Sequence, residues 1–347
     1  MLVGCGAVSQ QLYAPALQHL EKSGIAKVVA VVDPSLAARG ELARRFPRAQ
    51  ALAALAGVAG VQPGALAIIA SPAARHLEHV LAATTRGWHI LCEKPLAATS
   101  NDAEEMIKAA EDASVRFAVN HYRRFFSAAR ALKELCYGRT PLGQLMRFNV
   151  SEGGPFDWPA VSPAIFQRSE TPGGVLADLG VDALDLLVWW LGDPLDHAYA
   201  DDAMGGFEIN ARLTLRVGDV TGHVQLSRDW ATPNRYTFDF ARGRAVWSVN
   251  DANGLAIELQ GLPFTMRGNL AETSGLPTDN HPQSFLSHLR QVVVAVRDGS
   301  PVPVDARVGA RILRLIENCY ARRRPLAQPW LTLSEDQNAR RLSATTS

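Results

Sequence analysis

The chain begins with a short apolar run that leads directly into a glycine turn, Gly4-Cys5-Gly6-Ala7-Val8-Ser9. This spacing is typical of the turn that joins a β-strand to an α-helix where a dinucleotide binds. The first glycine permits the tight turn, and the second lets the backbone approach a diphosphate. Ser9 is small enough to keep the helix close to the strand. The pattern is weak by itself, so the segments that follow must support it.

Short aliphatic runs alternate with helical stretches as far as residue 120. We expect strands at 27–33, 66–71, 89–95 and 116–120, and helices at 35–46, 75–86 and 101–112. Strands separated by helices predict a parallel sheet with right-handed crossovers, which is the doubly wound, Rossmann-type α/β architecture. We expect this dinucleotide-binding domain to cover residues 1–119.

The pattern changes after Asn120 and predicts a second, α+β domain over residues 120–347. From 206 to 260 the sequence alternates apolar and polar residues between Gly, Asn and Asp turns. Consecutive strands of this kind indicate an open, mainly antiparallel sheet with one polar face. The helices expected at 282–298 and 305–321 could pack back on the first domain.

Composition excludes several classes of protein. Hydrophobic residues make up 47% and charged residues 20% of the 347 residues, which is typical of globular proteins. The net charge of +1, with scattered basic residues, argues against a nucleic-acid partner. No apolar run reaches the roughly 18 residues that span a bilayer, and no signal peptide is recognisable, so we expect a cytoplasmic protein. The cysteines are far apart and predict reduced thiols and no metal site: Cys5, Cys92, Cys136 and Cys319.

The second expected strand ends in an acidic residue, Asp33. A carboxylate at this point can accept hydrogen bonds from the adenosine ribose hydroxyls and would repel a 2′-phosphate. No arginine follows directly, since Pro34-Ser35-Leu36 comes next. We therefore favour NAD as the cofactor, with NADP possible. Asp33 as the N-cap of the following helix is compatible with both.

Another element of interest is Glu93-Lys94-Pro95, which stands at the carboxyl end of the strand expected at 89–95. Together with the glycine turn, this tripeptide resembles the glucose–fructose oxidoreductase/inositol dehydrogenase/MocA (Gfo/Idh/MocA) family. Further matching stretches are spread over most of the chain: 70–76, 120–125, 173–185 and 317–330. The resemblance implies hydride transfer between a nicotinamide and a carbinol carbon of a sugar, a cyclitol or a sugar derivative. It also implies homodimers or homotetramers that associate through the sheet of the second domain.

The resemblance also implies roles for individual residues. Lys94 takes the position of the family's catalytic lysine, and Asp178 takes that of its aspartate. The implied cofactor-binding set is Gly4, Gly6, Ala7, Val8, Ser9, Asp33, Ser71, Pro72, His76, Glu93, Lys94, Pro95 and Asn120. Arg123 belongs to the segment that crosses between the domains near the substrate. We add two substrate-binding candidates from the residues themselves, Trp158 as a stacking platform and Arg168 as a partner for an anion.

One position departs from the family pattern. Four residues after Asp178, where the family usually has histidine, this chain has Asp182. The two side chains are one helical turn apart and share a face. An ordinary aspartate has a pKa of about 4, so Asp182 is a weak base at neutral pH. Two carboxylates near Lys94 would favour its charged form, which predicts that the site reduces a ketone, with Lys94 donating the proton.

Three alternatives remain open at the level of sequence. His121 could supply the missing imidazole as a base or acid and contact the substrate. Catalysis could have been lost, which would leave a cofactor-binding regulator or scaffold of the same fold. Finally, a tightly held cofactor could serve as a shuttle between two sugars without leaving the protein.

Overall fold

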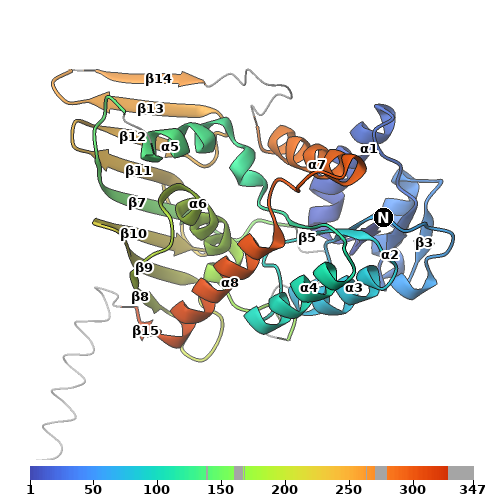
Figure 1. Ribbon diagram of the computed structural model, residues 1–347. Helices are drawn as coiled ribbons and strands as arrows, with labels where there is room; N and C mark the ends of the chain where they lie inside the picture. The colour runs from blue at the N-terminus through green and yellow to red at the C-terminus, as the bar shows by residue number, and fades with distance from the viewer. Residues whose placement is uncertain (138–139, 160–166, 168, 263, 270–279, 327–347) are drawn as a thin grey trace, which may run out of the picture.

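The structure is a computed structural model that describes residues 1–137, 140–159, 167, 169–262, 264–269 and 280–326. It contains two β-sheets that stand side by side, each accompanied by helices (Figure 1). Within the described residues, no helix has the length and apolar character needed to cross a membrane.

The first sheet is parallel and has six strands in the order β3-β2-β1-β4-β5-β6. Its strands are β1 (Leu2–Val3), β2 (Ala30–Val32), β3 (Gln50–Leu52), β4 (Leu66–Ile69), β5 (His89–Cys92) and β6 (Phe117–Val119). The central strands are aliphatic and buried, as expected for a sheet covered on both faces. This strand order is that of a Rossmann-type sheet, so the predicted fold of the N-terminal part is confirmed.

Helices flank this sheet, and two of them begin at side-chain caps. They are α1 (Ala14–Lys22), α2 (Leu36–Arg45), α3 (His76–Thr84) and α4 (Ser100–Asp112). The Ser35 hydroxyl accepts a hydrogen bond from the Ala38 N–H at 3.3 Å and caps α2, and Thr99 caps α4 in the same way through the Asp102 N–H. Ser35, rather than Asp33, is therefore the N-cap of α2.

The second sheet has nine strands in the order β14-β13-β12-β11-β7-β10-β9-β8-β15. The strands are β7 (Leu145–Gly153), β8 (Asp196–Asp201), β9 (Asn210–Val217), β10 (Val220–Ser227), β11 (Arg235–Phe240), β12 (Gly243–Ser248), β13 (Gly254–Leu259), β14 (Thr265–Asn269) and β15 (Arg324–Pro325). Neighbours are antiparallel except for β7 with β10 and β8 with β15, which are parallel. The predicted open, mainly antiparallel sheet is confirmed.

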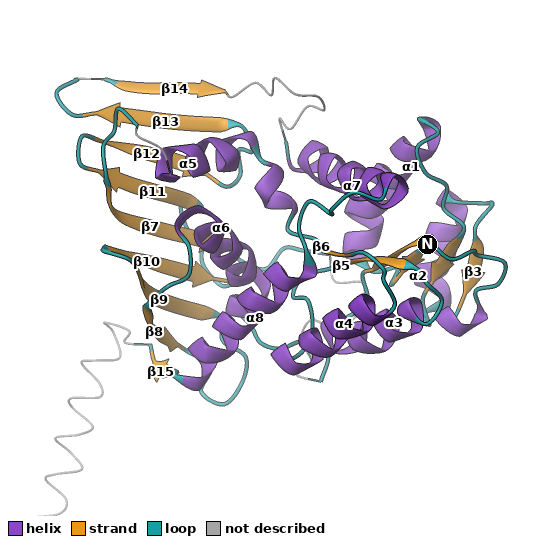
Figure 2. Cartoon of the chain, viewed as in Figure 1, coloured by secondary structure: helices purple, strands orange, loops and turns teal. Residues whose placement is uncertain are grey.

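Figure 2 shows helices on one face of this second sheet. Its helices are α5 (Ser127–Tyr137) and α6 (Val181–Leu191), joined by α8 (Ala306–Ala321). Between helices and sheet lies an aromatic core in which Trp190 meets Tyr236, Phe238 and Trp247 edge-on. Two helices reach across to the first sheet, since α7 (His281–Asp298) packs on α1 and α8 packs on α4.

Short 3₁₀ and π segments lie in several connections and helix starts. The 3₁₀ turns are η2 (Leu55–Gly57), η3 (Ala73–Arg75) and η4 (Tyr122–Phe125). The π-helical turns are η1 (Ser9–Tyr13), which leads into α1, and η6 (Leu176–Gly180), which leads into α6. Such π-turns occur often at functional sites, and here η1 follows the glycine turn while η6 contains Asp178.

Candidate active site

The glycine turn that follows β1 has the geometry of a dinucleotide cradle. Gly4 has a φ of +89°, and a Cβ atom there would lie 2.4 Å from the backbone oxygen of Ala70 at the end of β4. A Cβ atom at Gly6 would instead meet nothing within 4 Å, so the backbone is open to a ligand on that side. The Ser9 hydroxyl donates to the Gly4 carbonyl at 2.6 Å and draws the helix onto the strand. These residues fit the diphosphate of a dinucleotide.

Asp33 follows β2 and braces this turn. One carboxylate oxygen accepts the Cys5 N–H at 2.8 Å, and the other accepts the Ser35 N–H at 2.7 Å. Each oxygen keeps a second lone pair that could accept a ribose hydroxyl. Arg39 lies beside it and donates to the backbone oxygens of Asp33 and Pro34 at 3.1 and 2.8 Å. The charges of Asp33 and Arg39 would both affect whether NAD or NADP binds.

The loops after β4 and β5 are tied together by His76. Its Nε2 lies 2.7 Å from the Ser71 carbonyl and its Nδ1 lies 3.0 Å from the Leu96 carbonyl. The ring is only 1% exposed, and burial lowers the pKa of His76 despite both carbonyls. Its surroundings therefore favour a role in holding the loops that carry Pro72 and Pro95, rather than direct contact with a cofactor.

A buried polar network lies directly beneath Lys94. Asn120 donates through Nδ2 to Glu93 at 2.5 Å and to the Tyr13 hydroxyl oxygen at 3.0 Å. Its Oδ1 lies 2.8 Å from His288 Nδ1. The other oxygen of Glu93 accepts the Lys94 N–H at 3.1 Å, and burial raises the pKa of Glu93. This network fixes the backbone from which Lys94 projects.

The Lys94 side chain contacts Asp178 and Asp182, which lie more than 80 residues later in the sequence. Its ammonium donates to the backbone carbonyl of Asp178 at 2.8 Å and lies 3.1 Å from Asp182 Oδ2 and 3.8 Å from Asp178 Oδ1. The Lys94 side chain is 21% exposed, whereas that of Asp182 is 4% exposed. With two close acceptors, the ammonium keeps a third N–H for a further partner.

The charges around this ammonium decide its protonation. Burial alone would lower the pKa of Lys94, but the carboxylates of Asp182 and Asp178 outweigh it, and that pKa lies above its usual value. Burial alone would raise the pKa of Asp182, but Lys94 and Arg123 outweigh it, and that pKa lies below its usual range. The pair is therefore an ammonium and a carboxylate at neutral pH.

Sequence reasoning missed two partners of the cluster formed by Lys94, Asp178 and Asp182, namely Glu152 and Arg228. Arg123 lies 3.6 Å from Asp182 and 2.6 Å from Glu152, whose other oxygen accepts the Tyr236 hydroxyl at 2.7 Å. Arg228, which follows β10, pairs with Asp178. Glu152 was detectable in principle, because it shares the inward-facing parity of the apolar residues of β7. Nothing in the sequence around Arg228 marks it as a partner of Asp178.

His121 lies beside Asp185, outside the cluster formed by Lys94, Asp178 and Asp182. Its ring is 1% exposed, and neither nitrogen has a hydrogen-bond partner among the described residues. Nδ1 is 3.8 Å from Asp185, which Arg124 binds in a fork at 2.6 and 2.8 Å. Burial lowers the pKa of His121, with Asp185 acting in the opposite direction. A ring so enclosed is poorly placed to exchange a proton with a substrate.

The two predicted substrate-binding candidates Trp158 and Arg168 follow β7 in the sequence. Trp158 is 39% exposed, as a stacking platform would be. Arg168 lies outside the described residues. Closer to the cluster, the guanidinium of Arg228 stands 5.4 Å from the ring centre of Phe156.

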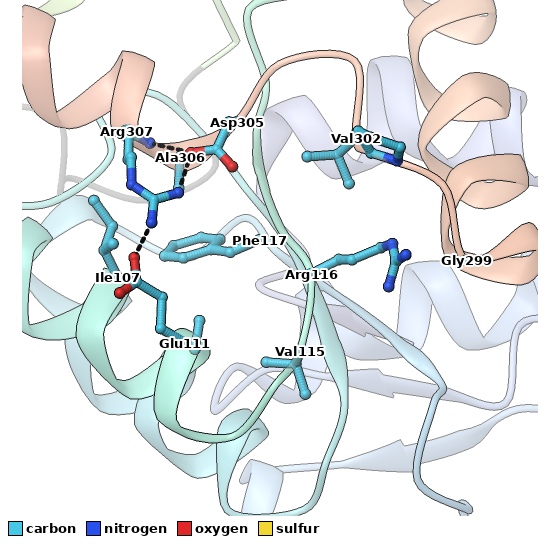
Figure 3. Close-up of a pocket in the computed structure, with 12 residues that line it drawn as sticks. Ile107, Glu111, Val115, Arg116, Phe117, Gly299, Val302, Asp305, Ala306 and Arg307 are labelled. Atoms are coloured by element: carbon cyan, nitrogen blue, oxygen red, sulfur yellow. Dashed lines mark hydrogen bonds and ion pairs between the residues drawn. The ribbon is translucent and has the colours of Figure 1, made fainter.

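A separate pocket of about 390 Å³ lies away from these residues, between the end of α4, β6 and the α7–α8 connection. Figure 3 shows Phe117 at its centre, with Arg307 bound to Glu111 and Asp305 on one side. No predicted site residue lines it. It therefore has no part in the candidate active site.

A glycine cradle on a Rossmann sheet, with a charged lysine and two carboxylates at the same edge, defines a nicotinamide-dependent oxidoreductase acting on CH–OH groups. Comparison with known families agrees. Residues 1–121 match the oxidoreductase family with an NAD-binding Rossmann fold, and residues 136–246 match the GFO/IDH/MocA C-terminal domain. The chain belongs to the Gfo/Idh/MocA family.

Relatives of known function cover nearly the whole chain. The chain is 26% identical over 341 residues to scyllo-inositol 2-dehydrogenase (NADP⁺) of Bacillus subtilis, covering 91% of each protein. It is 28% identical over 360 residues to D-glucoside 3-dehydrogenase of Escherichia coli, covering 92% of this chain and 93% of the relative. The fold is similar to levoglucosan dehydrogenase in complex with NADH and levoglucosan, with a TM-score of 0.77, 16% identity and coverage of 92% and 95%.

Proposed function

We propose that the protein transfers a hydride between a nicotinamide and a secondary alcohol or ketone of a sugar, cyclitol or sugar derivative, with Lys94 as the proton donor and acceptor. The observation that carries the proposal is the contact of the Lys94 ammonium with Asp178 and Asp182, at the same edge of the first sheet as the glycine cradle. The names of the relatives support the substrate class, since they act on inositol and on glucosides.

Lys94 supplies the proton chemistry in this proposal. The bound cofactor would supply or accept the hydride at the substrate carbon. In the direction of reduction, the free N–H of the ammonium donates its proton to the carbonyl oxygen, and Lys94 is left as a neutral amine. The carboxylates of Asp178 and Asp182 hold the ammonium in place and accept hydrogen bonds from neighbouring hydroxyls of the substrate.

The charges favour reduction over oxidation at neutral pH. Oxidation needs a neutral Lys94 to accept the hydroxyl proton. Burial lowers the pKa of this amine, but Asp182 and, to a smaller extent, Asp178 raise it above its usual value. Asp182 cannot take the proton instead, because Lys94 and Arg123 keep the pKa of its carboxyl low. Lys94 is therefore present as the proton-carrying ammonium that reduction needs, and scarcely as the neutral amine that oxidation needs.

We further propose NAD as the preferred cofactor, because the Asp33 carboxylate stands where ribose hydroxyls would bind and would repel a 2′-phosphate. Arg39 beside it supports NADP as a second cofactor. Among the other predicted cofactor residues, the backbone of residues 4–9 and the 71–72 and 93–95 loops would hold the dinucleotide.

Absorbance of the reduced nicotinamide tests the proposal. Purified protein with NADH and a panel of keto-sugars and keto-cyclitols should oxidise NADH with at least one of them. Lys94→Met should lower that rate by about 10²–10⁴-fold, the usual contribution of a general acid. NADH affinity, measured by fluorescence quenching, should change little. Turnover that survives Lys94→Met would contradict the role of Lys94.

Asp182 favours one alternative from another class, a cofactor-binding regulator or scaffold without activity. The same assay separates the two functions: NADH binding without turnover across the whole panel would support the scaffold. A third possibility, a cofactor shuttle, predicts that nicotinamide stays with the protein through gel filtration. The enzyme remains our proposal because the lysine keeps an N–H available for a substrate.

We also propose that two or more copies associate through the outer face of the second sheet. The strand register lines up a row of uncharged side chains across this face: Ala198, Thr214, His223, Asn149, Thr237, Val246 and Ala256. A row without charge suits contact with a second copy of itself.

A further inference from the structure

Glu208 lies between β8 and β9, outside the predicted site, and is only 2% exposed. Its Oε1 accepts hydrogen bonds from the N–H groups of Gly174 at 3.0 Å and Leu176 at 3.1 Å. The backbone oxygen of Glu208 accepts the Val175 N–H at 2.9 Å. Three consecutive N–H groups at the start of the segment that carries Asp178 therefore end on this one residue.

The two glycines of the segment explain how Glu208 can approach so closely. A Cβ atom at Gly174 would lie 2.1 Å from the Glu208 backbone oxygen. A Cβ atom at Gly173 would lie 1.9 Å from the hydroxyl of Tyr320. That hydroxyl donates to Glu208 Oε1 at 2.6 Å. The glycine pair therefore makes room for the Glu208 backbone and for the phenol that binds the Glu208 carboxylate.

The anchored turn continues into the π-turn η6 and so to the reacting lysine. The Asp178 N–H donates to the Gly174 carbonyl at 3.0 Å, one turn away from Glu208. The Asp178 carbonyl lies within η6 and accepts the Lys94 ammonium at 2.8 Å. Glu208 is thus linked to Lys94 through one short stretch of backbone.

The same carboxylate is tied to the end of α8. Arg323 Nη2 lies 3.6 Å from Glu208 Oε2, while its Nε lies 2.6 Å from Asp201. Asp201 also accepts the Tyr199 hydroxyl at 2.6 Å, but in the described part of the chain it forms no hydrogen bond or ion pair with residues 173–178. The cluster therefore contains one carboxylate that holds the turn and a neighbouring one that does not.

We propose that Glu208 is a positioning residue for proton transfer at Lys94: it anchors the glycine pair so that the Asp178 carbonyl and carboxylates of η6 and α6 hold the ammonium. This inference rests on the proposed function, because it assigns Glu208 to that reaction. A residue that only stabilised the fold would affect unfolding without changing the environment of Lys94.

Glu208→Ala tests the assignment with three readouts. Ketone reduction should fall by about 10- to 100-fold in kcat, the cost of misplacing a catalytic group, with little change in the KM for NADH. Hydrogen exchange of the peptide spanning 173–181 should accelerate. The pH profile of Lys94 acetylation by acetic anhydride, followed by mass spectrometry, should move to lower pH because the ammonium loses an acceptor.

Matched variants separate positioning from general damage. Glu208→Gln keeps an oxygen for the two N–H groups and should restore most of the activity. Tyr320→Phe removes one of three hydrogen bonds to Oε1 and should give an intermediate effect, which serves if Glu208→Ala fails to fold. Tyr199→Phe removes a buried hydroxyl from Asp201 in the same cluster and should leave all three readouts unchanged.

Two results would overturn the assignment. One is normal exchange over 173–181 and normal Lys94 acetylation in a folded Glu208→Ala protein. The other is an equal loss in Tyr199→Phe and Tyr320→Phe, which would indicate general destabilisation. If the wild-type protein reduced no substrate, the proposed function would fail, yet exchange and acetylation would still show whether Glu208 governs the surroundings of Lys94.

Discussion

At the scale of single residues, Asp182 changes the acid–base character of the site. A histidine at this position could take up a proton near neutral pH, whereas a carboxylate held between Lys94 and Arg123 stays charged. The negative charge is then used to keep Lys94 protonated. In the proposed reaction, the lysine is then the proton donor.

Asp182→His should reverse this effect. Loss of the carboxylate lowers the pKa of Lys94, since Asp182 is the largest influence that raises it against burial. Below its pKa the lysine is a charged acid, so the reduction rate should begin to fall at a lower pH than in the wild type, and alcohol oxidation at neutral pH should rise. The pH–rate profiles in both directions measure this. Asp219→His, on the exposed turn between β9 and β10, is the control and should match the wild type.

Asp33 should govern the choice of cofactor. Asp33→Ser removes the charge that repels a 2′-phosphate while Arg39 remains. The ratio of the NADPH and NADH dissociation constants should therefore shift toward NADPH by roughly tenfold, which corresponds to about 1.4 kcal/mol. Fluorescence quenching by the two cofactors gives the ratio. An unchanged ratio would show that the ribose does not bind beside Asp33.

Residue chemistry was predictable only where it follows a local motif. Lys94 and Asp178 could be named from their flanking sequences, and the structure places them together. Arg123 was expected near the substrate, but its pairing with Glu152 was not, because the two meet only when η4 and β7 are packed. Arg228 and Glu208 stand outside any motif. Their roles depend on the register of the second sheet, which a single sequence does not specify.

At the scale of elements, two glycines of the glycine turn serve different purposes: Gly4 is needed for the fold, and we expect Gly6 to be needed for binding the cofactor. Gly6→Ala should fold with an unchanged melting temperature, because its Cβ atom would have open space, but should bind NADH more weakly because we propose that the diphosphate occupies that space. Gly4→Ala should destabilise the protein, since φ is +89° and the Cβ atom would strike backbone. Strained backbone alone costs of order 1–3 kcal/mol.

Calorimetry and NADH titration of both variants check this difference. Equal melting temperatures for Gly4→Ala and the wild type would contradict the close approach of the turn to β4. Full NADH affinity in Gly6→Ala would contradict the placement of the diphosphate.

The strands that were predicted correctly share a strong apolar pattern, and those that were missed lack one. β3 (Gln50–Leu52) is a short edge strand with no β-branched residue. β8, β14 and β15 are also at or near an edge of the second sheet and were not predicted. The parallel pairing of β7 with β10 could not be read from the sequence either, because local alternation says nothing of which strands become neighbours.

At the scale of the whole molecule, association through the second sheet can be tested by charge. Thr237 lies within the uncharged row, between Asn149 and Val246. Light scattering should give the wild type a dimer or tetramer mass, and Thr237→Lys should shift it toward the 37.5 kDa of one chain. Gln62→Lys adds the same charge to an exposed loop of the first domain and should not. A wild-type protein of 37.5 kDa would refute the association.

Segments near the end of the chain also cover the edge of the first sheet. The Val119 N–H donates to the Val304 carbonyl at 3.0 Å, and Ala118 pairs with Asp305, so the α7–α8 connection closes the edge of the first sheet. Glu317 of α8 binds the N–H of Ser100 at the start of α4 at 2.6 Å. A fragment cut after residue 120 would carry an open strand edge and bare apolar helix faces, both of which invite aggregation. We therefore expect the nucleotide-binding domain to fold fully only after α8 has been synthesised.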